Sequence, residues 1–200
     1  MKKTLSVLAV LCLLITQKTT AQLEPGNVIV GADLANFRIA LKSGQETSLQ
    51  LTPNALWMLN SNLAIGAYVT LGYSAVKDAY TNTTYGVGPM ARYYFNDPKL
   101  NLLKHGRWFG QANVGIGGLN YNDKSAEDND RSTNGLDIGF GPGYAYFITQ
   151  NIAFETLLRY NGTLGFGHEA YTNYLNLHFG FQVYLPGKAT LNKVKSQEGM

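Results

Sequence analysis

The chain has 200 residues, of which 45% are hydrophobic and 14% are charged, with a formal net charge of +3. This length allows one ordinary domain with a sizeable core. No apolar run reaches the roughly 18 residues that a membrane-spanning helix needs, and an aromatic content of 12% excludes a disordered chain.

The first 21 residues have the three parts of a secretory signal peptide. Lys2 and Lys3 precede an apolar stretch at 5–15, and small residues end the segment at Ala21. Cleavage there would remove the single cysteine, Cys12, which argues against a small disulfide-stabilised secreted domain. Cleavage would also take three lysines from the 16 basic residues and so balance the 13 acidic ones, which leaves no electrostatic support for a nucleic-acid partner.

From residue 27 onward, the side chains alternate between apolar and small or polar. In 62–74, Leu63, Ile65, Val69 and Leu71 share one face, and glycines, alanines and polar residues occupy most of the other. Successive side chains of a strand point to opposite faces, so this pattern indicates strands. It predicts eight of them, at 27–41, 48–59, 62–74, 84–95, 108–120, 135–148, 151–160 and 172–185.

The polar face carries few charges, and this decides which side is inside. Arg92, Asp137, Glu155 and Arg159 stand singly among small residues, as suits a narrow lumen in which ions must find partners. The bulky apolar face suits lipid, where all backbone polar groups must be paired within a closed barrel. We therefore predict an all-β fold, an eight-stranded antiparallel up-and-down transmembrane β-barrel over residues 22–186, followed by a polar periplasmic tail at 187–200.

Connections and an internal repeat support this interpretation. Short turns are expected at 59–62 and 149–151, and longer polar loops at 76–83, 121–134 and 161–171. Residues 53–65 align without gaps to 142–154, and 89–96 repeats the first half of that pattern. The repeat predicts bulges or local distortion at Pro53, Pro89 and Pro142. It also predicts an aromatic girdle near the periplasmic membrane edge, made of Trp57, Tyr93, Phe95, Trp108 and Tyr146.

The stretches 53–66, 86–95, 141–155 and 175–185 resemble the small outer-membrane β-barrels of Gram-negative bacteria, of the OmpX, OmpW and OmpA-barrel type. The resemblance implies an outer-membrane location with both termini in the periplasm. It also implies a monomer surrounded by lipid and lipopolysaccharide and inserted by the barrel-assembly machinery. The chain departs from the family after 186, because many members end at an aromatic residue on the last strand.

The four lumen charges have two interpretations. The structural one is that Arg92, Asp137, Glu155 and Arg159 pair with one another, plug the barrel and fix its register. The alternative is a gate or a path for protons or ions, since charges within the membrane are often functional.

No catalytic, cofactor or metal site is expected. His178 is followed by Phe179-Gly180-Phe181, whereas the lipid A deacylases use a His-x-Ser-Asn motif, so we predict that the protein is not an enzyme. An acidic cluster near 123–130 lacks the glycine and the ligand spacing of a calcium loop, and it is interpreted as a solvated loop; its members are Asp123, Glu127, Asp128 and Asp130.

The predicted function is that of a small integral outer-membrane protein with a lumen filled by side chains. It would contribute to envelope structure, or to surface interaction through its loops. The alternative is a narrow, OmpW-like channel for small hydrophobic molecules. A soluble lipocalin-like binder is a third possibility, and it requires the apolar face to lie inside.

Overall fold

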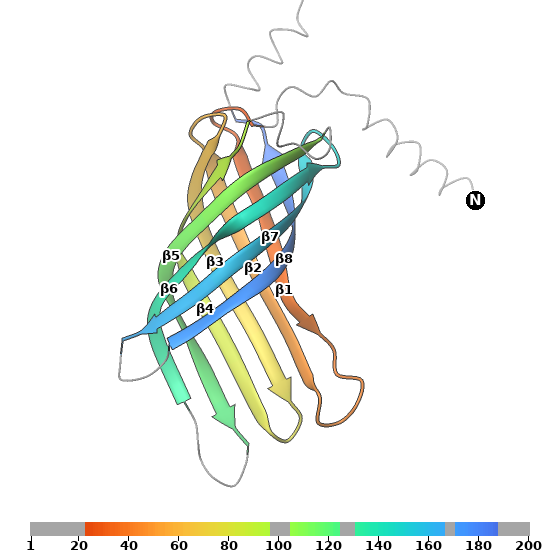
Figure 1. Ribbon diagram of the computed structural model, residues 1–200, viewed down its shortest axis with the longest axis vertical. Coiled ribbons are helices and arrows are strands. Elements are labelled where there is room, and N and C mark those ends of the chain that lie inside the picture. Colours follow the sequence, from red (N-terminus) through yellow and green to blue (C-terminus); the bar gives the residue numbers. More distant parts are fainter. Residues whose placement is uncertain (1–22, 97–104, 125–130, 167–170, 188–200) are drawn as a thin grey trace, which may run out of the picture.

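The computed structural model describes residues 23–96, 105–124, 131–166 and 171–187. Figure 1 shows a tilted barrel of long strands. There are eight in the described residues: β1 (Val28–Arg38), β2 (Glu46–Met58), β3 (Leu63–Val76), β4 (Tyr80–Tyr94), β5 (Gly106–Asp123), β6 (Arg131–Phe147), β7 (Ile152–Gly165) and β8 (Tyr171–Leu185). The predicted all-β fold with eight strands is confirmed.

Each strand pairs antiparallel with the next in the sequence, and β8 pairs with β1 to close the barrel. The closing ladder runs from Val28↔Leu185 to Leu34↔Phe179. β1 begins and β8 ends at one end of the barrel, here called the terminal end, which is the upper end in Figure 1. The opposite end, with the β1–β2 and β3–β4 connections, is called the loop end.

The predicted distribution of side chains between the two faces is also confirmed. Leu71, Ile116 and Phe181 are 54%, 60% and 58% exposed on the outer surface. On the inner face, Tyr68 and Arg92 are almost fully buried. This arrangement matches a barrel surrounded by hydrocarbon and excludes the lipocalin-like alternative, which needs an apolar interior and a polar exterior.

The three strand prolines interrupt hydrogen-bond ladders without shifting the register. The β4–β5 ladder stops at Val87↔Ile116 and resumes in the same register at Met90↔Asn113, so the interruption includes Pro89. The β2–β3 and β6–β7 ladders are interrupted in the same way at Pro53 and Pro142. The prediction of bulges or local distortion is therefore met by local distortion, and the ladders at these prolines contain no bulge. Within the described strands, the register shifts instead in β1, between Ala35 and Arg38.

The internal repeat builds the same turn twice at the terminal end. Between β2 and β3, the Asn60 side chain accepts hydrogen bonds from the backbone N–H groups of Asn62 and Leu63, at 2.8 and 2.9 Å. Between β6 and β7, Thr149 Oγ1 accepts from Ile152 N at 3.1 Å. These positions align in the repeat, and a short polar side chain at the start of each turn caps it.

Seven of the eight strands run further toward the loop end than predicted, whereas β1 ends at Arg38 rather than at 41. β4 begins at Tyr80 rather than at 84, β5 continues to Asp123, and β7 continues to Gly165. The predicted loops at 76–83, 121–134 and 161–171 are therefore too long, since much of each belongs to a strand. The predicted signal peptide at 1–21 and the tail at 187–200, except Gly187, lie outside the described residues and stay predictions, as does the part of the acidic cluster at 125–130.

Candidate functional site in the barrel lumen

Large side chains fill the lumen at the terminal end. Ile29 of β1, Met58 of β2 and Phe147 of β6 are buried there with two tyrosines, Tyr94 and Tyr184. The two tyrosine hydroxyls are hydrogen-bonded to each other at 2.7 Å, and the ring of Phe147 packs on that of Tyr184. This layer occupies the inside of the barrel next to the terminal turns.

A buried ion pair lies against this layer. Arg92 Nη1 of β4 is 2.7 Å from Glu155 Oε2 of β7, and both side chains are almost completely buried. Tyr184 donates to Glu155 at 3.0 Å, while Arg92 donates to Gln111 Oε1 from Nε and Nη2, at 3.0 and 2.6 Å. The guanidinium also lies 4.3 Å from the ring centroid of Phe109. Four strands thus meet on one pair of opposite charges inside the lumen, and their side chains stabilise both ions.

Asp137 and Arg159 do not join this ion pair. Asp137 accepts a hydrogen bond of 2.5 Å from the hydroxyl of Tyr68. Arg159 is buried over the ring of Tyr68, at 5.7 Å from its centroid, and its Nε and Nη1 atoms have no hydrogen-bond partner among the described residues. The four charges predicted to face the lumen therefore lie inside the barrel, but only Arg92 and Glu155 form an ion pair within the described residues.

Asp33 is a further lumen charge that the sequence reading missed. It is buried on β1 and accepts hydrogen bonds from Gln182 Nε2 at 3.2 Å and from Asn54 Nδ2 at 3.4 Å. The alternating pattern is least regular in this strand, which hid its orientation. The signal that could have identified Asp33 is its position as an isolated acidic residue between two apolar ones, Ala32 and Leu34.

Inward-facing glycines provide the room for these large side chains. A β-carbon on Gly143 would collide with the ring of Phe109, and one on Gly139 would collide with the Arg159 guanidinium. Asp33 lies against Gly180 in the same way. The large residues of one strand thus occupy the space left by glycines on its neighbours.

His178 lies inside the barrel, and neither of its ring nitrogens has a hydrogen-bond partner among the described residues. Within the same part of the chain, no three His, Cys, Asp or Glu side chains come together as a metal site. Among the described residues, His178 therefore forms no hydrogen bond with a serine hydroxyl.

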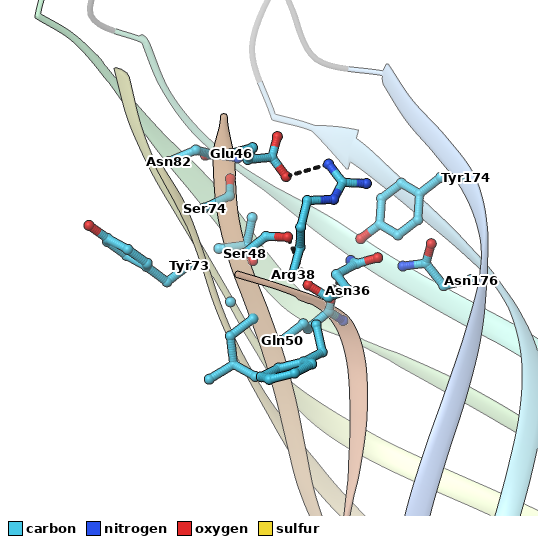
Figure 2. A pocket seen from close by; sticks show the side chains of 14 residues that line it. Asn36, Arg38, Glu46, Ser48, Gln50, Tyr73, Ser74, Asn82, Tyr174 and Asn176 are labelled. Carbon is cyan, nitrogen blue, oxygen red and sulfur yellow. Dashed lines mark hydrogen bonds and ion pairs between the residues drawn. The ribbon is translucent and has the colours of Figure 1, made fainter. Parts of the chain in front are cut away.

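The loop end of the lumen is hollow. A cavity of about 400 Å³ is lined mainly by polar side chains from β1, β2, β3, β4 and β8, and we call it the vestibule (Figure 2). A smaller cavity of about 160 Å³ shares three of its lining residues, Asn82, Thr84 and Tyr174, and reaches Asp137. The lumen is therefore filled at one end and recessed at the other.

Two solved structures of bacterial proteins share this architecture. The N-terminal β-barrel domain of Pseudomonas aeruginosa OprF is 13% identical, with a TM-score of 0.51, and the match covers 80% of this chain and 98% of that one. Neisserial surface protein A is 18% identical, with a TM-score of 0.53, covering 78% and 95%. The fold is that of the small eight-stranded outer-membrane barrels. Neither a family model nor a curated protein sequence matches the chain.

In this barrel, the five aromatic residues of the predicted girdle lie close to the terminal end. Trp57, Tyr93, Phe95 and Tyr146 are exposed on the outer surface, and Trp108 is half-buried. Two of them touch, since Tyr93 and Phe95 meet edge to face at 5.5 Å between ring centroids. Amphipathic and aromatic rings at this level suit the interface between hydrocarbon and headgroups.

The outer wall of the barrel has a hollow beside the interrupted ladder at Pro89. Its volume is about 840 Å³, and small outward residues, Ala55, Ala91 and Ala112, line it together with Trp57 and Ile65. Inward-facing residues also contribute to its surface, namely Leu56, Gly66, Met90 and Asn113. The hollow is almost entirely apolar in its lining, as expected of a surface that faces acyl chains.

Proposed function

We propose that this protein resides in the bacterial outer membrane as a barrel closed to passage, and that it acts at the cell surface through its vestibule and loops. The observation that carries the proposal is the Arg92–Glu155 pair, together with the rings of Phe109, Tyr94 and Tyr184 that enclose it. A pore needs a continuous aqueous path, and these groups occupy the lumen near its terminal end.

The proposal includes an orientation. The terminal end would face the periplasm and the vestibule would face the outside of the cell. It is supported by two of the three connections at the terminal end, the turns at 59–62 and 148–151, which are tight, since the periplasmic turns of such barrels are characteristically short; the connection between β4 and β5 is longer. In this orientation the partners would be outer-membrane lipid and lipopolysaccharide around a monomer, with the barrel-assembly machinery needed only for insertion.

A conductance measurement tests the closed lumen. The purified protein, inserted into a planar lipid bilayer, should give no stable current steps, while a large porin in the same bilayer serves as the positive control. A double variant, R92A/E155A, removes both charged side chains without leaving either ion unpaired, and it should raise the frequency of small openings. Stable, reproducible conductance steps from the unmodified protein would overturn the proposal.

A narrow channel for small hydrophobic molecules is the second candidate. It is favoured by the hollow beside Pro89, because inward-facing Met90 and Asn113 reach its lining where the β4–β5 ladder is interrupted. Uptake of a lipophilic fluorescent dye into liposomes that contain the protein distinguishes the two candidates. Uptake above that of empty liposomes, abolished by Ala91→Trp in the hollow, would favour the channel.

A further inference from the structure

The seam between β1 and β8, where the barrel closes, is paired over only part of its length. The β1–β8 ladder ends at Leu34↔Phe179, whereas the β7–β8 ladder continues toward the loop end as far as Leu164↔Tyr171. β1 shifts register after Ala35, and Asn36 has a φ of 52°. The two strands therefore part toward the loop end, and both line the vestibule there.

The described lining of the vestibule is almost neutral. Its two charged residues, Arg38 and Glu46, pair with each other at 3.2 Å near the mouth. The other polar side chains are amides and hydroxyls: Asn36, Gln50, Asn82, Asn176, Ser48, Ser74, Thr84, Tyr73 and Tyr174. An ionic ligand would find no unpaired counter-charge among these residues, whereas a neutral polar ligand could form hydrogen bonds on several sides.

Two of these amides have an unused hydrogen-bonding atom. Asn82 Oδ1 and Asn176 Nδ2 are both buried and have no partner in the described part of the chain. Figure 2 shows Asn82 on one side of the cavity and Asn176 on the other. One atom is an acceptor and the other a donor, so a ligand that both donates and accepts would satisfy both once the two amides rotate toward the cavity. A ligand with several hydroxyl groups does both.

Asn36 is held in place on the floor of the same cavity. Its side chain donates to Gln50 Oε1 at 3.0 Å, and its backbone carbonyl accepts from Ser48 Oγ at 2.8 Å. A positive φ is uncommon for a residue other than glycine, and such strain is concentrated at ligand-binding positions. The amide is thus fixed before any ligand arrives, which lowers the entropic cost of binding.

We propose that the vestibule binds a neutral saccharide. Its volume of about 400 Å³ lies within the range of small-molecule sites, roughly 300–1,000 Å³. The ring of Tyr174 offers an apolar face beside the amides, and a sugar ring has both hydroxyls and apolar C–H faces. This inference deepens the proposed function and rests on it, because the ligand must reach the vestibule from outside the cell.

The saccharide could be free or could be the headgroup of a lipid. The parted seam bears on this choice, because Phe37 of β1 and Leu175 of β8 are each 63% exposed beside it. A lipid tail could lie against these side chains while its headgroup occupies the vestibule. Maltose and dodecyl maltoside share one headgroup and differ in the tail, so comparing them separates the two sources.

Binding is measured on the processed protein in an amine-oxide detergent, which carries no sugar. Maltose, cellobiose and N,N′-diacetylchitobiose are the neutral probes for calorimetric titration, and glucuronate and glucosamine are the charged ones. At least one neutral disaccharide should bind with a Kd below about 1 mM. Asn82→Ala and Asn176→Ala should each weaken that binding roughly three- to ten-fold. Asn120→Ala, an exposed asparagine outside the vestibule lining, is the matched control and should leave the Kd unchanged.

Three results would overturn the inference: no binding of any neutral disaccharide, equal or tighter binding of a charged probe, or unchanged affinity in both vestibule variants. Heat-modifiable gel migration of each variant verifies that it is folded. Native mass spectrometry with dodecyl maltoside identifies the source of the saccharide. If dodecyl maltoside binds at least ten-fold more tightly than maltose does, the ligand is a lipid headgroup. If the two bind equally well, the ligand is a free sugar. The two proposals can fail separately. If the barrel conducts and binds the sugar, only the proposed closed lumen is refuted. If it does not conduct and binds no sugar, only the proposed saccharide site is refuted.

Discussion

At the scale of single residues, a buried and an exposed arginine–glutamate pair differ in what they contribute to stability. Arg92 and Glu155 have lost nearly all contact with water, so each ion depends on the other and on neighbouring hydroxyl and amide groups. Arg38 and Glu46 also form an ion pair, with 3.2 Å between Nη1 and Oε1, but the arginine side chain is 67% exposed. Water solvates the second pair and can replace either partner.

Arg92→Met should therefore be strongly destabilising, because it leaves the carboxylate of Glu155 buried and unpaired. We expect a loss of about 3–5 kcal/mol in the free energy of unfolding. The double variant R92M/E155L should recover most of it, and Arg38→Met should cost less than about 1 kcal/mol. Urea unfolding in lipid vesicles, followed by tryptophan fluorescence, measures all three. Equal stability of Arg92→Met and the unmodified protein would show that the pair is dispensable.

Substitution at Gly143 tests how tightly the lumen is packed. A β-carbon there collides with the ring of Phe109, so Gly143→Ala should destabilise the barrel by about 1–3 kcal/mol or reduce the folded fraction. Gly110→Ala on β5 is the control, because its nearest atoms, on Phe95, lie 4.0 Å from the added carbon. The folded fraction is read from heat-modifiable migration on gels. If both variants fold equally well, the lumen is looser than described.

At the scale of strands, the sequence predicted the faces well and the ends poorly. The alternation at Leu63, Ile65, Val69 and Leu71 is a direct consequence of one face meeting hydrocarbon, so it identifies that face without knowledge of the partners. Beyond the hydrocarbon the constraint on side chains ends, while backbone pairing continues, as at Tyr80↔Asp123. Polar residues there look like a loop in the sequence although they belong to strands.

The prolines allow a test at this scale. Pro89 lacks the N–H group that the β4–β5 ladder needs, so Pro89→Val should supply a donor at the interrupted position. The amide of residue 89 should then be protected from hydrogen exchange to an extent similar to that of Val87, which pairs with Ile116. Exchange measured by NMR in micelles gives both values. Fast exchange at 89 beside a protected Val87 would show that the wall is open there for a reason other than the missing donor.

At the scale of the whole molecule, large buried side chains occupy the lumen near the terminal end, and a cavity lies at the loop end. Neither feature is local in the sequence. The ion pair joins residues 63 positions apart, and the vestibule takes its lining from five strands. The sequence predicted Arg92 and Glu155 as inward-facing charges, but which charges meet depends on barrel closure and stagger. The vestibule amides, such as Asn82 and Asn176, carry no pattern that sets them apart from other polar residues in the strands.

The central claim is that the bulky face of the sheet meets lipid and the small, polar face lines the interior. Spin labels on single cysteines along β3 test it, and the sole native cysteine, Cys12, lies in the predicted signal peptide. In vesicles, labels at 65, 69 and 71 should collide readily with dissolved oxygen, which concentrates in hydrocarbon, and labels at 64, 68 and 70 should not. The opposite alternation, or equal access of a water-soluble nickel complex to both sets, would contradict the account.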